Sequence, residues 1–266
     1  MLLCIDIGNT HTHYGVVANG QAFFHRYLPT RQIDHPSDGF GPVLARLVAA
    51  HPQLEGAAFC SVVPAAAKLL RRVFEQARFP GEPFQLTAEC RLGVPLHYPR
   101  PEEIGQDRLA NAAGAQVLCG SPAVVIDLGT AVTFDILTRA HGYEGGIIAP
   151  GVEVMRRYLH EQTALLPLLD DSLDLSGVIG RSTVEAMRIG TVIGFGGMIR
   201  ALLEAVLDEL ARRGEALPTV LVTGGTAALL EKTLRHPFTL VPDLTLRGLA
   251  AAWRLNRPSG VTLPPG

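Results

Sequence analysis

Short apolar runs alternate with helical patterns along this chain. The runs that are bounded by Gly, Pro or Asn predict β-strands, because such residues interrupt regular structure. They lie near residues 2–8, 14–28, 55–63, 83–88, 123–129, 133–138, 143–149 and 218–223. Apolar side chains at helical spacing predict helices over 65–78, 107–118 and 182–213. Since short hairpins and helical crossovers both occur, the pattern indicates an α/β protein with mixed sheets.

The longest helical pattern, over 182–213, has its own start and stop signals. Ser182-x-x-Glu185 is a capping box, and Gly214 follows the last periodic position. Each interior glycine of a helix costs about 1 kcal/mol relative to alanine. We therefore expect close helix packing, a kink, a subunit interface or a nucleotide against these glycines. They are Gly190, Gly194, Gly196 and Gly197.

Two segments of the chain share nearly the same sequence pattern: IDIGNTHTHYGVV at 5–17 and IDLGTAVTFDILT at 126–138. Each predicts a strand that ends in Asp-x-Gly, a hydroxyl-rich turn and a second strand. A glycine at the bend lets backbone N–H groups approach a ligand closely. Asp6 or Asp127 at the mouth of such a loop suits a phosphate accompanied by a cation. The repeat predicts two related α/β halves that close on a nucleotide, over residues 1–118 and 119–266.

Three further patterns could carry chemistry. Thr223-Gly224-Gly225-Thr226 is a glycine-rich strand-to-helix turn that could face an anion. Asp107 lies where a loop enters a helix, and capping alone would explain it. The positive charge of Arg108 beside it is unfavourable for the helix dipole. An Arg next to an Asp can instead form a site in which the Arg binds a carboxylate and the Asp accepts a proton from a hydroxyl group. His11 and His13 form an HxH pair, but without a recognisable third ligand we favour solvent-facing or phosphate-side roles over a metal site.

Composition narrows the class of protein. The 266 residues are 47% hydrophobic and 18% charged, with a net charge of −2, which predicts a sizeable core and no nucleic-acid surface. The N-terminus enters a strand at once, and no uninterrupted apolar stretch reaches about 18 residues. We expect a cytoplasmic protein without a membrane span. The cysteines form no CxxC pair and are expected to be buried, reduced thiols: Cys4, Cys60, Cys90 and Cys119.

In their order along the chain, these motifs resemble the type III pantothenate kinases. Single motifs are shared with other actin-like ATPases and sugar kinases, but the full ordered set is specific. It comprises IDIGNT at 5–10, SVVP at 61–64, YPRPEEIGQDR at 98–108, IDLGTAVTFD at 126–135, EGGIIAPGV at 144–152, TALLP at 163–167, IGRSTVEAM at 179–187, TGG at 223–225 and LTLRGL at 244–249.

The resemblance implies two duplicated actin/Hsp70-like (ribonuclease H-like) α/β domains around a nucleotide cleft. It implies transfer of the ATP γ-phosphate to the primary hydroxyl of pantothenate, giving 4′-phosphopantothenate in the first step of coenzyme A biosynthesis. It further implies Mg²⁺ with ATP, a monovalent cation (K⁺ or NH₄⁺) and a homodimer.

The resemblance also implies roles for individual residues. Asp107 would be the general base, Asp127 would bind the monovalent cation, and Asp6 would help to hold Mg²⁺ through water. Thr183 would contact pantothenate, across the dimer. The remaining pantothenate pocket would comprise Tyr98, Gly105, Gln106, Asp107 and Arg108. ATP would contact Asp6, Ile7, Gly8, Asn9, Thr10, His11, Thr12, His13 and Thr130.

Three positions depart from the family pattern: His11 replaces an Asn, Gln106 an Ala and Val132 a Thr. They bear on the phosphate contacts and on the shape of the pantothenate pocket. Two other functions stay open. One is a kinase for another small hydroxyl or carboxyl substrate, although a neutral sugar would not need Arg108. The other is a non-catalytic nucleotide-binding regulator of the same family, which the intact carboxylates at Asp6, Asp107 and Asp127 disfavour.

Overall fold

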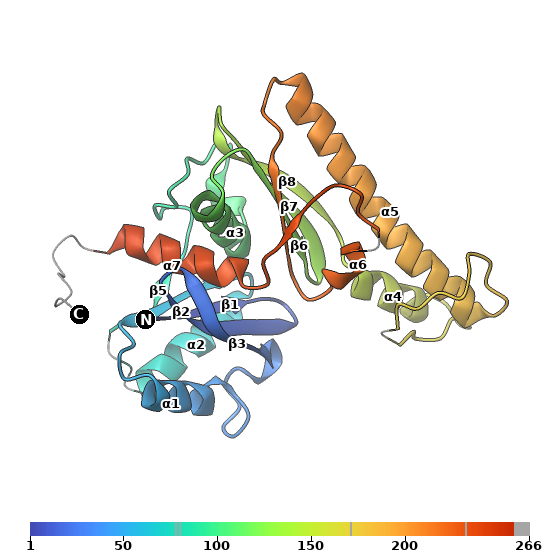
Figure 1. The fold of residues 1–266 in the computed structure, drawn as a ribbon. Helices are drawn as coiled ribbons and strands as arrows, with labels where there is room; N and C mark the ends of the chain where they lie inside the picture. Colours follow the sequence, from blue (N-terminus) through green and yellow to red (C-terminus); the bar gives the residue numbers. More distant parts are fainter. Residues whose placement is uncertain (78, 80, 171, 232, 258–266) are drawn as a thin grey trace. The chain divides into compact units, whose positions relative to one another are not determined.

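The computed structural model describes residues 1–77, 79, 81–170, 172–231 and 233–257 (Figure 1). The chain divides into two compact units. Unit 1 comprises Met1–Gly120 with Asp243–Gly266, and unit 2 comprises Ser121–Pro242. The chain passes from unit 1 to unit 2 at Ser121, close to the boundary predicted after residue 118. The C-terminal segment, however, groups with the N-terminal half of the chain.

Unit 1 is built on a five-stranded sheet of order β3-β2-β1-β4-β5. The first three strands form an antiparallel meander, and β1, β4 and β5 are parallel. Strands β1 and β4 are inner strands and most of their residues are buried, which explains their continuous apolar runs. The strands are β1 (Leu2–Ile7), β2 (His11–Ala18), β3 (Gln21–Pro29), β4 (Gly56–Ser61) and β5 (Phe84–Gln85).

Helices cover both faces of this sheet. Figure 1 shows α1 (Phe40–Ala50) and α2 (Pro64–Gln76) on one face, with α3 (Gln106–Leu118) and α7 (Leu244–Asn256) on the other. Short 3₁₀ turns, η1 (Thr30–Gln32) and η2 (Pro101–Glu103), lie in the connections. The first face carries the main core of the unit, which includes Leu3, Ile5, Val16, Phe40, Leu44, Phe59, Leu70 and Phe74.

Helices α3 and α7 pack backbone to backbone. A Cβ atom built on Gly248 would overlap the carbonyl oxygen of Ala110, and one on Gly114 would lie 2.8 Å from the carbonyl oxygen of Leu244. Only glycine fits at such an approach. The contact fixes α3, whose first turn carries the predicted base, against the C-terminal helix.

Unit 2 repeats the topology of unit 1. Its sheet has the order β10-β9-β6-β7-β8, with β6, β7 and β8 antiparallel and β6, β9 and β10 parallel. Read from β8 to β10, the strand order and directions match those of unit 1. The strands are β6 (Ala123–Leu128), β7 (Ala131–Thr138), β8 (Gly142–Pro150), β9 (Thr219–Thr223) and β10 (Thr239–Leu240). This duplication confirms the predicted α/β fold class.

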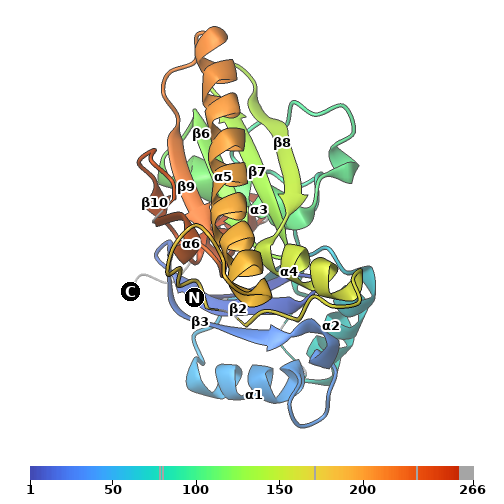
Figure 2. The ribbon, with the colours of Figure 1, turned by 90° about the vertical axis from the view of Figure 1, so that its right-hand side faces the viewer.

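One long helix, α5 (Thr183–Arg212), covers a face of the second sheet (Figure 2). It buries Phe195, Ile199 and Leu203 against the apolar face of β6 and β9. Two short helices, α4 (Val152–Glu161) and α6 (Ala228–Glu231), complete the unit. Among the described residues, α5 is the one helix whose length and composition would allow it to cross a membrane. The core helix of a soluble protein can pass the same test, and 33% of the apolar window of α5 is buried in the structure.

Several predicted elements need correction. The single strand expected over 14–28 is wrong: Asn19 and Gly20, with φ values of 50° and 78°, form a tight turn that separates β2 from β3. Two positive φ values are the signature of a two-residue hairpin turn. The predicted helix over 65–78 corresponds to α2, which ends at Gln76, and residue 78 lies outside the described residues. Helices α1, α4 and α7 and strand β10 have no counterpart among the elements predicted from the sequence.

Candidate active site

The tip of the first hairpin is the exposed part of the predicted ATP loop. The N–H group of Gly8 donates to the carbonyl oxygen of His11 at 3.1 Å, and a Cβ atom on Gly8 would lie 2.9 Å from that oxygen. Glycine therefore permits the bend. Asn9, Thr10 and His11 are exposed at the tip, whereas the side chain of Ile7 is buried in the core.

Thr12 and His13, also predicted ATP contacts, have partners inside unit 1. The Thr12 hydroxyl lies 3.1 Å from that of Thr30, which donates to the Gly8 carbonyl oxygen at 2.7 Å. His13 Nε2 lies 3.0 Å from His25 Nδ1, and its ring stacks on Tyr27 at 4.3 Å. Burial lowers the pKa of His13 to about 4, so its ring is neutral at pH 7. These two side chains hold the hairpin in shape.

Asp6 and Asp107 both lie near one buried thiol. Asp6 on β1 is in register with Cys60 on β4, and the thiol donates to Asp6 Oδ1 at 3.2 Å. Burial raises the pKa of Cys60 well above its usual value, and the charges of Asp6 and Asp107 raise it further. Cys60 is therefore a protonated donor. Two predicted carboxylates thus gather at the ends of β1 and β4.

Asp107 lies in the first turn of α3, where Gly105 makes room for it. A Cβ atom on Gly105 would lie 2.5 Å from Asp107 Oδ1, which accepts the N–H of Arg108 at 2.8 Å. Burial raises the pKa of Asp107, while the N–H group and charge of Arg108 oppose that shift. The Arg108 side chain is buried beside it. A carboxylate of raised pKa next to a buried guanidinium can accept a proton from a hydroxyl.

Gln106 and Tyr98, the other predicted pocket residues of unit 1, differ in their surroundings. Gln106 Oε1 accepts hydrogen bonds from the N–H of Ser61 at 2.9 Å and from Gln85 Nε2 at 3.2 Å. Its side chain is thus directed at β4 and β5. Tyr98 is half-buried in the segment that leads to η2. Sequence reasoning gave no role to Cys60, Ser61 or Gln85, because strand register and these long-range contacts leave no local motif.

Three glycine-rich turns meet at the end of β6 in unit 2. Gly129 N–H donates to the Ala131 carbonyl oxygen at 3.1 Å, which closes the second hairpin beside Thr130. Gly151 N–H donates to the Thr130 carbonyl oxygen at 3.0 Å. A Cβ atom on Gly224, whose φ is +95°, would lie 2.5 Å from the Leu128 backbone nitrogen. Asp127 lies in register with Thr133 of β7 and Thr223 of β9 at this end of the sheet.

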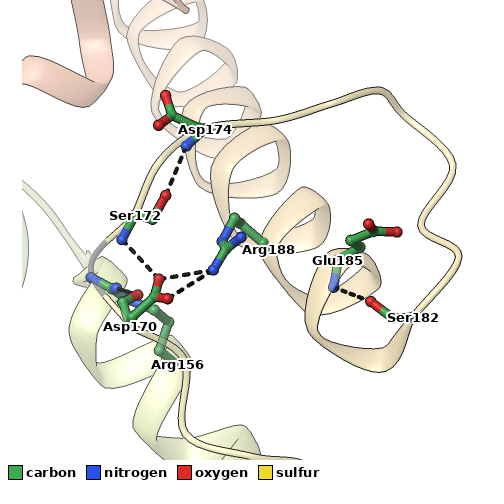
Figure 3. Close-up of polar contacts among 7 residues, drawn as sticks. All are labelled: Arg156, Asp170, Ser172, Asp174, Ser182, Glu185 and Arg188. Atoms are coloured by element: carbon green, nitrogen blue, oxygen red, sulfur yellow. Dashed lines mark hydrogen bonds and ion pairs between the residues drawn. The ribbon is translucent and has the colours of Figure 1, made fainter.

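Thr183 is exposed at the first residue of α5, and the capping box predicted around it is confirmed. The N–H of Glu185 donates to Ser182 Oγ at 3.2 Å, and Glu185 Oε2 accepts the N–H of Arg181 at 2.7 Å. One turn further on, Arg188 pairs with Asp170 at 2.8 Å, as Figure 3 shows. These contacts hold the segment that precedes Thr183 against the helix. Thr183 belongs to unit 2, while the other predicted pantothenate contacts belong to unit 1.

The donor set suits a phosphate-bound cation better than a protein-only metal cage. Within the described ranges, no group of three or more His, Cys, Asp or Glu side chains could hold a metal ion. Mg²⁺ in kinases needs only one or two carboxylates, because substrate phosphates and water complete its shell. A single carboxylate beside a glycine loop, as at Asp6, fits that requirement.

Two duplicated α/β units, each with a carboxylate beside a glycine hairpin, define a phosphotransferase of the actin-like ATPase class. The sequence profile of the type III pantothenate kinases matches residues 2–205. A type III pantothenate kinase of Akkermansia muciniphila is 41% identical over 257 residues, covering 96% of this chain and 98% of the relative. One of Methylacidiphilum infernorum is 40% identical over 248 residues, covering 93% and 86%. The chain therefore belongs to the type III pantothenate kinase family, ATP-dependent enzymes of the first step of coenzyme A biosynthesis.

Solved structures agree on the fold. A Campylobacter jejuni protein described as a Baf family transcriptional activator superposes with a TM-score of 0.60 at 18% identity, covering 96% of this chain and 98% of its own. The ethanolamine utilization protein EutJ of Carboxydothermus hydrogenoformans gives 0.52 at 13% identity, covering 94% and 89%. At such identities the likeness concerns the fold alone.

Proposed function

We propose that the kinase transfers the γ-phosphate directly to the primary hydroxyl of pantothenate, with Asp107 as general base. The observation that carries the proposal is the position of Asp107. It is half-buried beside the buried Arg108, in the same neighbourhood as Asp6 and Cys60. Asp107 accepts the hydroxyl proton late, when the oxygen is already bonding to phosphorus, so a carboxylate suffices for an alcohol.

Arg108 and the segment around it are assigned to pantothenate. A guanidinium binds a carboxylate through two parallel hydrogen bonds, and pantothenate carries one carboxylate. Tyr98 and the segment Gly105–Arg108 line the proposed pocket in unit 1. This set favours pantothenate over a neutral sugar, which offers Arg108 no anionic partner.

ATP-phosphate contacts are assigned to the glycine hairpins. In unit 1 they involve the loop that follows Asp6, above all its exposed tip at Asn9, Thr10 and His11. In unit 2 they involve Thr130. Mg²⁺, held through water by Asp6, would neutralise charge on the transferring phosphate. Asp127 is assigned to a monovalent cation, K⁺ or NH₄⁺, because its carboxylate lies at the strand ends beside two threonines, and such cations take oxygen ligands.

A homodimer is proposed through α5. Gly190, Gly194 and Gly197 lie on one face of the helix. Apart from the backbone of α5 itself, no atom of the described residues lies within 4 Å of a Cβ atom built on any of them. Ile193 on the same face is 45% exposed. An exposed face of small and apolar residues allows a second helix to approach closely, and Thr183 at the start of α5 would then contact pantothenate in the partner.

Asp107→Asn tests the catalytic assignment, since the amide keeps the shape of the side chain and removes its basicity. We expect kcat to fall by about three orders of magnitude, within the range that general base catalysis contributes with positioning. ATP affinity, measured by calorimetry, should stay within about twofold. Turnover is followed as pantothenate-dependent release of ADP. A variant that keeps near-normal turnover would show that Asp107 is not the base.

A further inference from the structure

The Gln106 side chain joins the first turn of α3 to three other elements of unit 1. Its Oε1 accepts hydrogen bonds from Ser61 N–H at the end of β4 and from Gln85 Nε2 on β5. Gln85 Oε1 in turn accepts from Arg71 Nη2 of α2 at 2.8 Å. The Arg71 guanidinium also lies over the Phe59 ring, 5.1 Å from its centroid. The three side chains thus form a continuous chain of contacts that ends beside Asp107.

The donors at each end fix the orientation of both amides. A backbone N–H can only donate, so the atom of Gln106 that faces Ser61 is the oxygen. A guanidinium likewise only donates, so Gln85 turns its oxygen to Arg71 and its nitrogen to Gln106. Flipping either amide would place two donors against each other. The network therefore has a single direction, from the Arg71 guanidinium to the Gln106 oxygen.

Gln106 takes the place of a missing strand partner. The last register pair between β4 and β5 is Phe59 with Gln85, and the N–H of Leu86 still reaches the Phe59 carbonyl oxygen. The N–H of Ser61 lies beyond that pair and donates to Gln106 instead. If the Gln106 side chain turned away toward a substrate, this part-buried N–H would lose its acceptor, which is unfavourable.

The start of α3 depends on this contact. The N-cap residue is Gly105, which offers no side-chain cap. On β4, Ser61 follows directly after Cys60, whose thiol holds Asp6. Gln106 thus ties the turn that carries Asp107 to the strand that orients Asp6.

We propose that the side chain of Gln106 is a positioning residue, which with Gln85 and Arg71 sets the place of Asp107 relative to Asp6. The proposal rests on the role of Asp107 as general base. It gives the Gln106 side chain no contact with pantothenate, and leaves the side chains of Tyr98, Asp107 and Arg108 to line the pocket.

Gln106→Leu removes the acceptor and leaves an apolar side chain that is one bond shorter. We expect kcat to fall 10–100-fold, because an ångström of misplacement costs about that much in a phosphoryl transfer. KM for ATP and for pantothenate should each stay within about threefold. Gln106→Glu keeps the acceptor oxygens and should recover at least fivefold in kcat over Gln106→Leu. The matched control is Gln116→Leu at the other end of α3, which should keep kcat within twofold.

A second variant distinguishes loss of the network from loss of the folded state. Gln85→Leu leaves the bond from Gln106 to Ser61 intact and should lower kcat three- to tenfold. Combined with Gln106→Leu, it should add little, since both act through one network. Thermal unfolding of each variant verifies that the protein is folded.

Three results would overturn the proposal: a Gln106→Leu kcat within twofold of wild type, a loss confined to KM for pantothenate, or a Gln106→Glu variant as impaired as Gln106→Leu. The Asp107→Asn variant distinguishes a failure of the positioning role from a failure of the proposed general base. If it is inactive while Gln106→Leu is unimpaired, only the positioning role fails. If it retains turnover, the proposed base and the positioning role fail together.

Discussion

At the first turn of α3, a carboxylate and a guanidinium adjacent in sequence have opposite effects on proton affinity. Burial makes Asp107 hold a proton more tightly, and the charge of Arg108 makes it hold one less tightly. Burial wins, so the pKa of Asp107 is raised. A base with a pKa nearer to neutrality accepts a proton more readily from an alcohol. The cation at this helix terminus, unfavourable for the helix dipole, is explained by its carboxylate neighbour.

The hydrogen bond from Cys60 to Asp6 could not be predicted from residue types alone. The sequence predicts a buried thiol at each cysteine, which is confirmed for Cys60 and Cys4 but wrong for Cys119, whose side chain is exposed near the end of α3. The hydrogen bond of Cys60 to Asp6 follows from the register of β1 with β4, which joins residues 54 positions apart. No local pattern encodes that register. The role of Cys60 as a donor to Asp6 became visible only in the fold.

His13 makes stability depend on pH. Its pKa is about 4 in the folded protein against an ordinary value of 6.5. Below pH 6.5 His13 binds a proton in the unfolded chain but stays neutral in the folded protein. The free energy of unfolding therefore falls as the pH drops from 6.5 toward 4. We expect a loss of about 2 kcal/mol between pH 7 and pH 5, at about 1.4 kcal/mol per pKa unit. Urea unfolding at both pH values measures it.

The control for this prediction is a histidine in the same hairpin. His13→Gln should flatten the pH dependence of the free energy of unfolding, whereas His11→Gln, at the exposed tip, should leave it as in wild type. Equal pH slopes for wild type and His13→Gln would contradict the assignment.

At the scale of elements, the two Asp-x-Gly hairpins were predictable because each repeats a local motif. Asp-x-Gly after an apolar strand gave the position of both loops and both carboxylates. The structure adds that the first loop is longer by one residue: Gly8–Thr10 against Gly129 and Thr130. The missed turn at Asn19 and Gly20 was also local, since an Asn-Gly pair favours such a hairpin. The contacts of Gln106 and Gln85 were not local, and no spacing rule would have found them.

The contact between α3 and α7 gives a prediction at this scale. Gly248→Ala would drive a methyl group into the backbone of α3 at Ala110. The helices must separate, and we expect a loss of about 1–3 kcal/mol in the free energy of unfolding, as for other overpacked sites. Activity should fall as well, because α3 carries Asp107.

A second glycine-to-alanine change serves as its control. Gly41 in α1 has its nearest neighbour, Val73 Cγ1, at 3.9 Å from a built Cβ atom. Gly41→Ala should therefore be neutral, or stabilising by up to about 1 kcal/mol through helix propensity. Denaturant unfolding of both variants decides the point. Equal stability of the Gly248 and Gly41 variants would show that α3 and α7 tolerate separation.

At the scale of the whole molecule, the duplication followed from the repeated hairpin, and the matching strand orders confirm it. The grouping of the C-terminal helix was not foreseen. Sequence order placed α7 with the second half of the chain, whereas it packs on α3 and belongs to unit 1. The glycines that permit this packing, Gly114 and Gly248, lie in different parts of the sequence. A hydrophobic pattern says that a helix has a buried face, but not which helix covers it.

The proposed dimer gives a prediction at the same scale. Gly194→Leu adds a side chain where the protomer leaves open space, so the fold of the chain should be unaffected. Sedimentation equilibrium should show that this variant dissociates while wild type remains dimeric. Ala211→Leu, an equally exposed change near the end of α5, should dimerise as wild type does. Monomeric wild type, or a dimeric Gly194→Leu variant of unchanged affinity, would remove α5 from the interface.

The central claim is that Asp107 takes the hydroxyl proton, and the pH dependence of the single-turnover transfer rate tests it most directly. The base must be ionised, so the wild-type rate should decline as the pH falls through the pKa of Asp107, with a midpoint above the usual aspartate value of about 3.9. In Asp107→Asn the remaining slow rate should lose that decline. An unchanged acid limb in the Asn variant would mean that another group accepts the proton.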